Sequence, residues 1–207
     1  MIRDQETLDQ LVSLIDRFVS ERLVPRENEL AESEKLPDDV LTEMKELGLF
    51  GLTIPEEYGG LGLTMEEEIQ VAISLGRTSP AFRSIMGTNN GIGSAAIVFN
   101  GTEKQKQKYL PKYASGEWIS CFCLTEPDAG SDAASLKTTA VRDGDHYILN
   151  GSKRYITNAK VANTFNVMAR TNPSIQGARG ISSFIVEKIR RELLSALSIR
   201  KWGNRVQ

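Results

Sequence analysis

The sequence predicts an α+β protein in which a helical half precedes a half built from short strands. Up to Gly116, apolar residues recur with the 3.6-residue period of amphipathic helices. After Gly116 they alternate with a period of two, and β-branched and aromatic residues become frequent. Helical and strand patterns do not alternate along the chain, so a βαβ architecture is not expected. We therefore predict a helical domain over residues 1–116 and a β domain over residues 117–188.

Three amphipathic helices are expected near residues 7–23, 37–48 and 64–76. The first has Thr7 and Gln10 placed as a capping box, and the third has Thr64 and Glu67 in the same relation. The second begins with a proline in its first turn and ends at a glycine. On the third helix, Ile69, Ala72 and Ile73 lie on one side, which we expect to face the core.

Two further helices complete the helical half. Ser79-Pro80 opens a stretch that is apolar on most sides up to Phe99, which predicts a single buried helix. Residues 102–113 are rich in Lys and Gln and predict a short surface helix.

The β half begins with the alternating run of residues 118–125. Residues 146–149 and 152–157 flank Asn150-Gly151, the dipeptide that a type I′ turn requires, so this segment predicts a hairpin. Residues 164–169 and 181–186 add two more strands.

Composition excludes several classes of protein. The 207 residues are 40% apolar and 25% charged, with a formal net charge of −2, which excludes disordered and collagen-like chains. No apolar run approaches the ~20 residues of a membrane span, and the first residues lack a secretory signal. We expect a cytoplasmic protein that binds neither nucleic acid nor membrane. Cys121 and Cys123 are expected as free thiols, and one histidine, His146, argues against a His/Cys metal site or a Ser-His-Asp triad.

One glycine motif resembles a nucleotide fingerprint. Residues 91–96, GIGSAA, match the Gly-x-Gly-x-x-Gly/Ala pattern of dinucleotide-binding folds. The strand that should precede such a motif is missing, because residues 88–90 continue a helical pattern. Close helix packing therefore explains these glycines better than nicotinamide binding.

The loop of residues 125–132 follows directly on a strand and combines hydroxyls, carboxylates and a glycine. Its backbone amides with Ser131 suit a phosphate, and Thr125 suits the edge of a heterocycle. An ordinary turn that caps itself is the alternative, and the local chemistry alone favours it. Glu126, Asp128 and Asp132 share this tight turn, so we interpret them as capping groups and not as a glycosidase pair.

A second candidate segment lies in the predicted hairpin. Tyr155 and Thr157 are two residues apart on one predicted strand and would share a face. An aromatic ring beside a hydroxyl suits a flat ligand such as a flavin, although a half-buried sheet face would look the same.

Two strings carry a resemblance to a known family. Residues 122–132, FCLTEPDAGSD, resemble the flavin-binding signature of the acyl-CoA dehydrogenase family, and residues 153–158, KRYITN, resemble its second flavin motif. The similarity extends to residues 54–62 and 101–110 and covers residues 1–188. The family's first two domains, one helical and one small and β-barrel-like, agree with the predicted boundary.

The resemblance implies an FAD-dependent oxidoreductase that converts an acyl-CoA thioester to the 2-enoyl-CoA and is reoxidised by an electron-transfer flavoprotein. Family members are homo-oligomers. By position, the FAD contacts fall to Phe122, Leu124, Thr125, Gly130, Ser131, Tyr155, Ile156 and Thr157, with Ser131 also reaching the CoA arm. Many members have tryptophan where this chain has Tyr155, which puts the stacking on the flavin ring in question.

Family members also continue into a C-terminal helical domain that supplies the catalytic glutamate. We expect a truncated, inactive form, because no carboxylate in residues 1–188 matches that base, so no catalytic residue is assigned. The competing hypothesis is a non-catalytic module that binds acyl-CoA or a partner.

Residues 189–207 differ in composition, with a net charge of +4 against −6 for residues 1–188. Codons shifted by one base permit a sequence similar to the family's continuation, with Trp202 read as Met. We therefore expect a frameshifted tail, and a basic amphipathic helix is the alternative.

Overall fold

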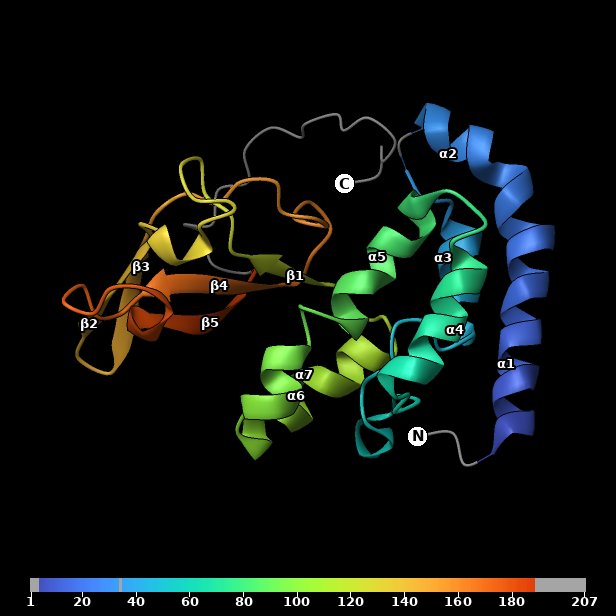
Figure 1. The fold of residues 1–207 in the computed structure, drawn as a ribbon, viewed down its shortest axis with the longest axis horizontal. Coiled ribbons are helices and arrows are strands. Elements are labelled where there is room, and N and C mark those ends of the chain that lie inside the picture. Colours follow the sequence, from blue (N-terminus) through green and yellow to red (C-terminus); the bar gives the residue numbers. More distant parts are fainter. Residues whose placement is uncertain (1–3, 34, 189–207) are drawn as a thin grey trace.

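The computed structural model describes residues 4–33 and 35–188, which form a group of helices on one side and a twisted sheet on the other (Figure 1). The tail of residues 189–207, for which a frameshift was predicted, lies outside the described residues. The predicted boundary at residue 116 falls between the last helix and the first strand. The α+β class is confirmed.

The first helix, α1 (Gln5–Phe18), continues into a π-helical turn, Val19–Leu23, and a 3-10 turn, Val24–Arg26. Its N-cap is Asp4, whose carboxylate accepts a hydrogen bond of 2.8 Å from the Thr7 amide. The predicted capping box at Thr7 is therefore wrong, because Asp4 caps the helix earlier and leaves Thr7 inside the first turn.

Helix α4 (Met65–Leu75) begins with the predicted capping box between Thr64 and Glu67. The predicted buried face is wrong, since Ile69 and Ile73 are 52% and 63% exposed. Val71 and Leu75 are buried instead. The helix carries apolar residues on two sides, and packing against α1 selects the other one.

Two shorter helices precede α4, namely α2 (Glu27–Ser33), which sequence patterns did not indicate, and α3 (Asp38–Glu46). The predicted single helix over residues 80–99 is divided into α5 (Pro80–Asn90) and α6 (Ala95–Asn100). The surface helix is confirmed as α7 (Glu103–Ala114), with a capping box between Thr102 and Gln105. The short 3-10 turns are Glu56–Tyr58, Ala133–Ser135 and Ala178–Gly180.

Gly93 lies in the turn between α5 and α6. A Cβ at this position would lie 2.1 Å from the Ser120 Oγ and 2.5 Å from the Thr88 carbonyl oxygen. The glycine thus lets the α5–α6 turn approach the first strand closely, which is a packing role and not a nucleotide-binding one.

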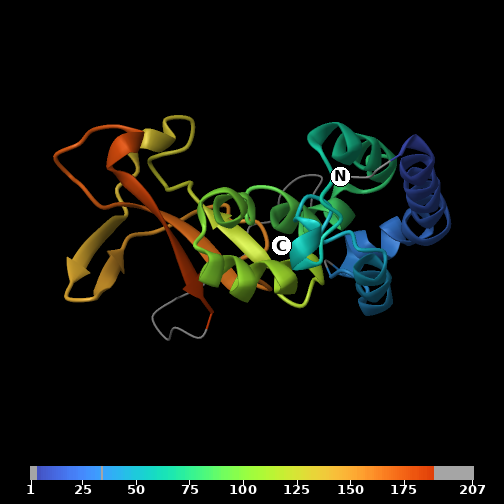
Figure 2. The same ribbon diagram turned by 90° about the horizontal axis from the view of Figure 1, so that it is seen from below.

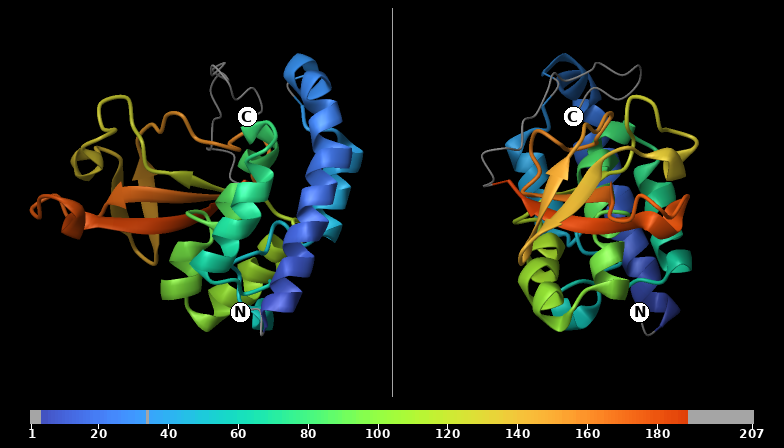
Figure 3. Two further views of the ribbon diagram at one scale, coloured as in Figure 1. Left: turned by 45° about the vertical axis from the view of Figure 1, so that its right-hand side comes forward. Right: turned by 90° about the vertical axis from the view of Figure 1, so that its left-hand side faces the viewer.

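The strands are β1 (Ser120–Cys123), β2 (Thr139–Asp143), β3 (His146–Asn150), β4 (Thr164–Arg170) and β5 (Ile181–Glu187). They form one mixed sheet in the order β1-β4-β2-β3, with β5 antiparallel to β4. β1 is parallel to β4, with Ser120 opposite Thr164. Figure 3 shows β4 and β5 side by side, extending away from the helices.

The predicted hairpin is wrong in its partners. β3 pairs with β2, through a turn at Gly144 and Asp145, and residues 151–157 form no strand. A Cβ at Gly151 would lie 2.7 Å from the Thr138 Cα. Gly151 is therefore needed for close approach to the entry of β2, and Gly144, with a φ of 62°, supplies the turn.

The helical half is joined to the sheet by α5, α6 and α7, which lie between the other helices and the strands (Figure 2). The buried Asn89 side chain on α5 accepts a bond of 2.8 Å from the Ser120 amide and donates to the Tyr113 and Trp118 carbonyls. The Tyr113 hydroxyl lies 2.6 Å from the Thr164 hydroxyl of β4. Buried hydrogen bonds therefore fix the sheet to the helices at β1, where the candidate site begins.

Candidate functional site

The first candidate segment starts on β1. Cys121 and Cys123 point into the small core of the sheet, and Phe122 points to the other side and is half-buried. The strand ends at Cys123, two residues before the end predicted from sequence, and Leu124 and Thr125 continue as a half-buried loop. The alternation of β1 thus presents Phe122 away from the cysteines.

The second candidate segment, residues 151–158, returns beside the end of β1. The Arg154 amide donates a hydrogen bond of 2.8 Å to the Thr125 carbonyl oxygen. The two segments are separated by about 30 positions in the sequence and meet at this bond. The structure therefore brings Thr125 next to the Arg154–Thr157 stretch.

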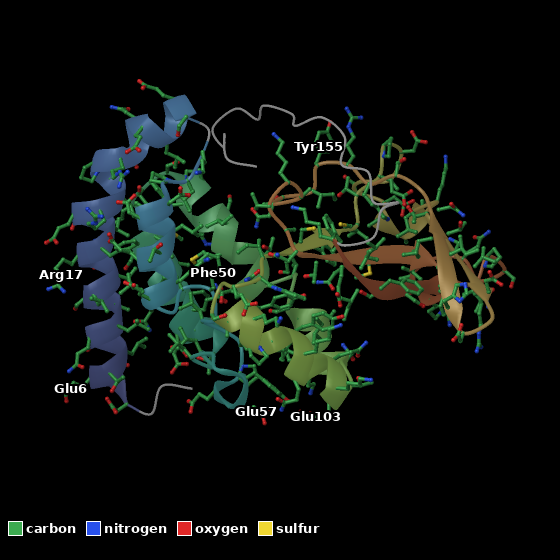
Figure 4. The ribbon with its side chains drawn as sticks, turned by 180° about the vertical axis from the view of Figure 1, so that it is seen from behind. Glu6, Arg17, Phe50, Glu57, Glu103 and Tyr155 are labelled. Carbon is green, nitrogen blue, oxygen red and sulfur yellow. The ribbon has the colours of Figure 1, made fainter. Side chains whose placement is uncertain are left out.

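Tyr155 lies near this junction with a backbone conformation that the sequence did not indicate. It has a left-handed backbone with φ of 58°, so the predicted strand face shared with Thr157 does not exist. The residue is 49% exposed, and the Arg154 guanidinium lies 4.7 Å from the centroid of its ring. Figure 4 shows Tyr155 at the edge of the molecule, between the helices and the sheet. Ile156 packs against the core of the sheet, and Thr157 is half-buried.

Gly130 and Ser131 lie in the exposed loop that follows Glu126. A Cβ at Gly130 would meet no atom within 4 Å, so internal packing does not require a glycine there. Within residues 4–33 and 35–188, no hydrogen bond joins Gly130 or Ser131 to residues 151–158. These two residues thus stand apart from the Thr125–Arg154 junction, on open backbone that a ligand can approach.

Three hydroxyls of the predicted site have no hydrogen-bond partner within the described part of the chain: those of Thr125, Ser131 and Thr157. Nearby hydroxyls are used internally, such as that of Ser135, which donates to Asp132. Thr125 and Thr157 are half-buried and Ser131 is exposed, and hydroxyls that the protein does not use are suited to a polar ligand edge. The donor set therefore fits a flavin nucleotide, which offers carbonyl, nitrogen and phosphate acceptors.

Glu126 was interpreted from sequence as a capping group of its own turn. In the structure it also binds residues that are distant in the sequence. Its carboxylate accepts bonds of 2.6 Å from the Lys137 amide and 2.9 Å from the Thr138 amide, as well as one from the Thr138 hydroxyl. The Lys153 ammonium lies 2.8 Å away. Burial acts to raise the pKa of Glu126, but the bonds from Lys153, Thr138 and the two amides outweigh it and lower that pKa to about 2.

Asn158 is a further residue that the sequence did not single out for a role. It is buried, has a left-handed φ of 66°, and ends the second segment. Its amide group donates to the Ser84 and Ile85 carbonyl oxygens, both at 3.1 Å, and to the Thr88 hydroxyl at 2.9 Å. Asn158 thereby fixes residues 155–157 to α5. Asparagine tolerates left-handed backbone, which is the only signal that a sequence offers here.

The remaining polar residues of the loop are engaged at the surface. Asp128 forms an exposed ion pair of 3.2 Å with Lys137, and Asp132 accepts from Ser135. Cys121 and Cys123 are free thiols that no disulfide joins, and their sulfur atoms lie 3.7 Å apart. His146 is the first residue of β3, and its Nδ1 lies 3.0 Å from the Asp145 Oδ1. No cluster of metal-ligating side chains occurs in the described residues, and no helix among them is long and apolar enough to cross a membrane.

Comparisons with known proteins agree with this organisation. Residues 5–117 match the acyl-CoA dehydrogenase N-terminal domain, and residues 121–206 match the acyl-CoA dehydrogenase middle domain. An acyl-CoA dehydrogenase of Bacillus subtilis is 38% identical over 175 residues, which are 84% of this chain and 46% of that protein. The chain spans about half, or less, of the length of the curated relatives that it matches.

Two solved structures illustrate the range of the similarity. A Bacillus anthracis acyl-CoA dehydrogenase complexed with FAD has a TM-score of 0.80 and 35% identity, covering 96% of this chain and 34% of that one. The prolyl acyl carrier protein oxidase AnaB has a TM-score of 0.88 and 34% identity, covering 96% of this chain and 53% of that one. With both domain models matched in order, and with the two motifs joined at Thr125 and Arg154, this chain belongs to the acyl-CoA dehydrogenase family.

Proposed function

We propose that this chain provides the FAD-binding part of an oxidoreductase that dehydrogenates an acyl-CoA thioester to the 2-enoyl-CoA. The observation that carries the proposal is the hydrogen bond from the Arg154 amide to the Thr125 carbonyl oxygen, which brings the two flavin motifs together. The half-buried, unpartnered hydroxyls of Thr125 and Thr157 add donors on either side of this junction.

Each residue has a distinct proposed task. Phe122 and Leu124 line the ring, Tyr155 packs on it, Ile156 supports the segment from the core, and Thr125 binds the pyrimidine edge. Gly130 and Ser131 take the pyrophosphate, and Ser131 also takes the CoA arm. Thr157 directs its hydroxyl to the part of the ring where charge develops on reduction. When bound, FAD would supply the hydride acceptor that no side chain can replace.

No carboxylate of the site is proposed as the base that removes the α-proton. Glu126 is committed to Lys153 and to backbone amides, and its pKa of about 2 makes it a poor proton acceptor. Asp128 forms an ion pair with Lys137, and Asp132 accepts a hydrogen bond from Ser135. We therefore expect the 207-residue chain alone to show no steady dehydrogenation with an artificial electron acceptor. Sustained turnover would show that a base lies within this chain.

FAD binding provides the direct test of the site. We expect the purified chain to bind FAD, measured by quenching of flavin fluorescence. Thr157→Ala and Ser131→Ala should weaken binding by about 0.5–1.5 kcal/mol each, the value of one hydrogen bond, and somewhat more at a phosphate. Asp128→Ala is the matched control, since its exposed ion pair contributes little. Equal affinity in all three variants would refute the site assignment.

The competing function, a module that binds acyl-CoA or a partner without chemistry, is separated by absorbance. A flavin band that bleaches when acyl-CoA is added supports the oxidoreductase. A colourless chain that still binds CoA supports the module. The electron-transfer flavoprotein partner, the homo-oligomer and the cytoplasmic location remain predictions.

A further inference from the structure

The ion pair between Lys153 and Glu126 is buried beside the junction of the two flavin motifs. The side chains are 11% and 6% exposed, and the Lys153 Nζ lies 2.8 Å from the Glu126 Oε1. The same ammonium donates a bond of 3.0 Å to the Leu124 carbonyl oxygen. Lys153 therefore holds both the backbone and a side chain of the first motif.

Glu126 extends this contact to a third piece of chain. Its second oxygen, Oε2, accepts from the Lys137 amide, while Oε1 also accepts from the Thr138 amide at the entry of β2. Gly151 packs on Thr138 so closely that no side chain fits between them. The loop after β1, the entry of β2 and the segment from 151 to 154 thus converge on one carboxylate.

The ion pair lies next to the residues that are proposed to contact the flavin ring. Lys153 immediately precedes Arg154, whose amide binds the Thr125 carbonyl oxygen, and Leu124 immediately precedes Thr125. Two hydrogen bonds from consecutive residues therefore join consecutive carbonyls of the other segment. A displacement of Lys153 would therefore displace Arg154 and Thr125 as well, because adjacent residues of both segments are joined by hydrogen bonds.

We propose that Lys153 and Glu126 form a positioning pair that sets the spacing between the two flavin-binding segments. This inference rests on the proposed function, because the segments matter for FAD only if FAD binds there. The pair need not touch the cofactor, and it acts through Leu124, Thr125 and Arg154. The desolvation of two buried charges offsets much of their mutual attraction, so a pair of this kind adds little net stability. This favours a role in specifying geometry.

A set of variants separates positioning from stability. Lys153→Met leaves Glu126 buried without its cation, and the double variant E126Q/K153M removes both charges. We expect the double variant to unfold at a lower urea concentration than the parent chain but to stay folded without urea. Its FAD dissociation constant, measured without urea, should stay raised about tenfold or more. We expect Lys153→Arg to keep the charge and to recover part of the affinity.

Lys137→Met is the matched control, because its ammonium belongs to the exposed pair with Asp128. Its FAD affinity should stay within about twofold of the parent value. Flavin absorption maxima provide a second measurement, which loss of stability alone would not shift. If the double variant binds FAD with parental affinity and spectrum, the pair is structural only and the inference is refuted. Should it fail to fold, Glu126→Gln decides, because it removes the negative charge of the pair, and parental affinity and spectrum in that variant refute the inference.

Failure of the proposed function gives a different result. If the parent chain binds no FAD, the flavin site is refuted, and the amide NMR signals of Thr125 and Arg154 still report the geometry of the junction. Shifts of both signals in the double variant, but not in Lys137→Met, would show that the pair sets the junction. Unchanged signals would refute the positioning role without reference to FAD.

Discussion

In the helical half, buried apolar side chains from α1 to α5 and the turns between them form one core that includes Phe50. In the two segments proposed to bind FAD, by contrast, the buried side chains of Glu126 and Asn158 are polar. Figure 4 shows the contrast, with Phe50 among the helices and Tyr155 at the edge of the molecule. Glu126 and Asn158 are the polar anchors of the segments. Apolar packing tolerates exchange of one side chain for another of similar volume, but a hydrogen-bonded anchor depends on atom positions. The helical half can thus serve as support while the segments keep a geometry fit for a ligand.

The largest expected effect tests the apolar side of this comparison. Phe50→Ala removes a fully buried ring and should lower the free energy of unfolding by about 3–5 kcal/mol. Urea denaturation measures it. Phe99→Ala, at a position 79% exposed, is the control and should change stability by no more than about 0.5 kcal/mol. Similar losses in the two variants would mean that Phe50 is not in a packed core.

The polar side of the comparison should appear as a dependence on pH. The pKa of Glu126 is lowered from 4.5 to about 2 in the folded chain, so its contribution is fully present above the unfolded pKa. It is lost as the pH falls from about 5 towards 2, and a shift of this size corresponds to about 3 kcal/mol. Denaturation of the parent chain and of Glu126→Gln, measured from pH 7 to pH 3, isolates the contribution. Parallel curves for the two proteins would contradict it.

Asn158 should show an intermediate effect with two separable parts. Asn158→Gly keeps the left-handed backbone and loses the bonds to α5, at a cost of about 1–3 kcal/mol. Asn158→Ala should cost about 1 kcal/mol more, because a Cβ disfavours a φ of 66°. Thermal unfolding of both variants gives the comparison. Equal stability of the glycine variant and the parent would remove Asn158 as an anchor.

The smallest effect concerns a single helix end in the helical half, the N-terminus of α4. Thr64→Ala removes the hydroxyl that accepts from the Glu67 amide and should destabilise the chain by about 1 kcal/mol. Thr64→Ser keeps the hydroxyl and should cost only a few tenths of that. An alanine variant as stable as the serine variant would show that the α4 cap contributes nothing to global unfolding.

The sequence could be read correctly where a signal is local. The capping box at Thr64, the surface helix α7 and the strands β4 and β5 each follow from side chains within a few positions of one another. The two flavin motifs were identified from resemblance, and not from residue chemistry, which favoured a plain turn for residues 125–132. Local signals also misled, as at Asn150-Gly151, where the glycine serves packing on Thr138.

By itself the sequence determined that a helical half precedes a β half, and with it the α+β class and the family, because periodicity, caps and motifs are properties of short stretches of chain. Tertiary structure decided which face of α4 is buried, that β2 pairs with β3, and that Tyr155 leaves the strand conformation. It also decided that Lys153 meets Glu126 and that Asn158 meets α5. These outcomes depend on partners that are far away in sequence. The residues next to a side chain along the chain do not determine which distant surface will pack on it and exclude water.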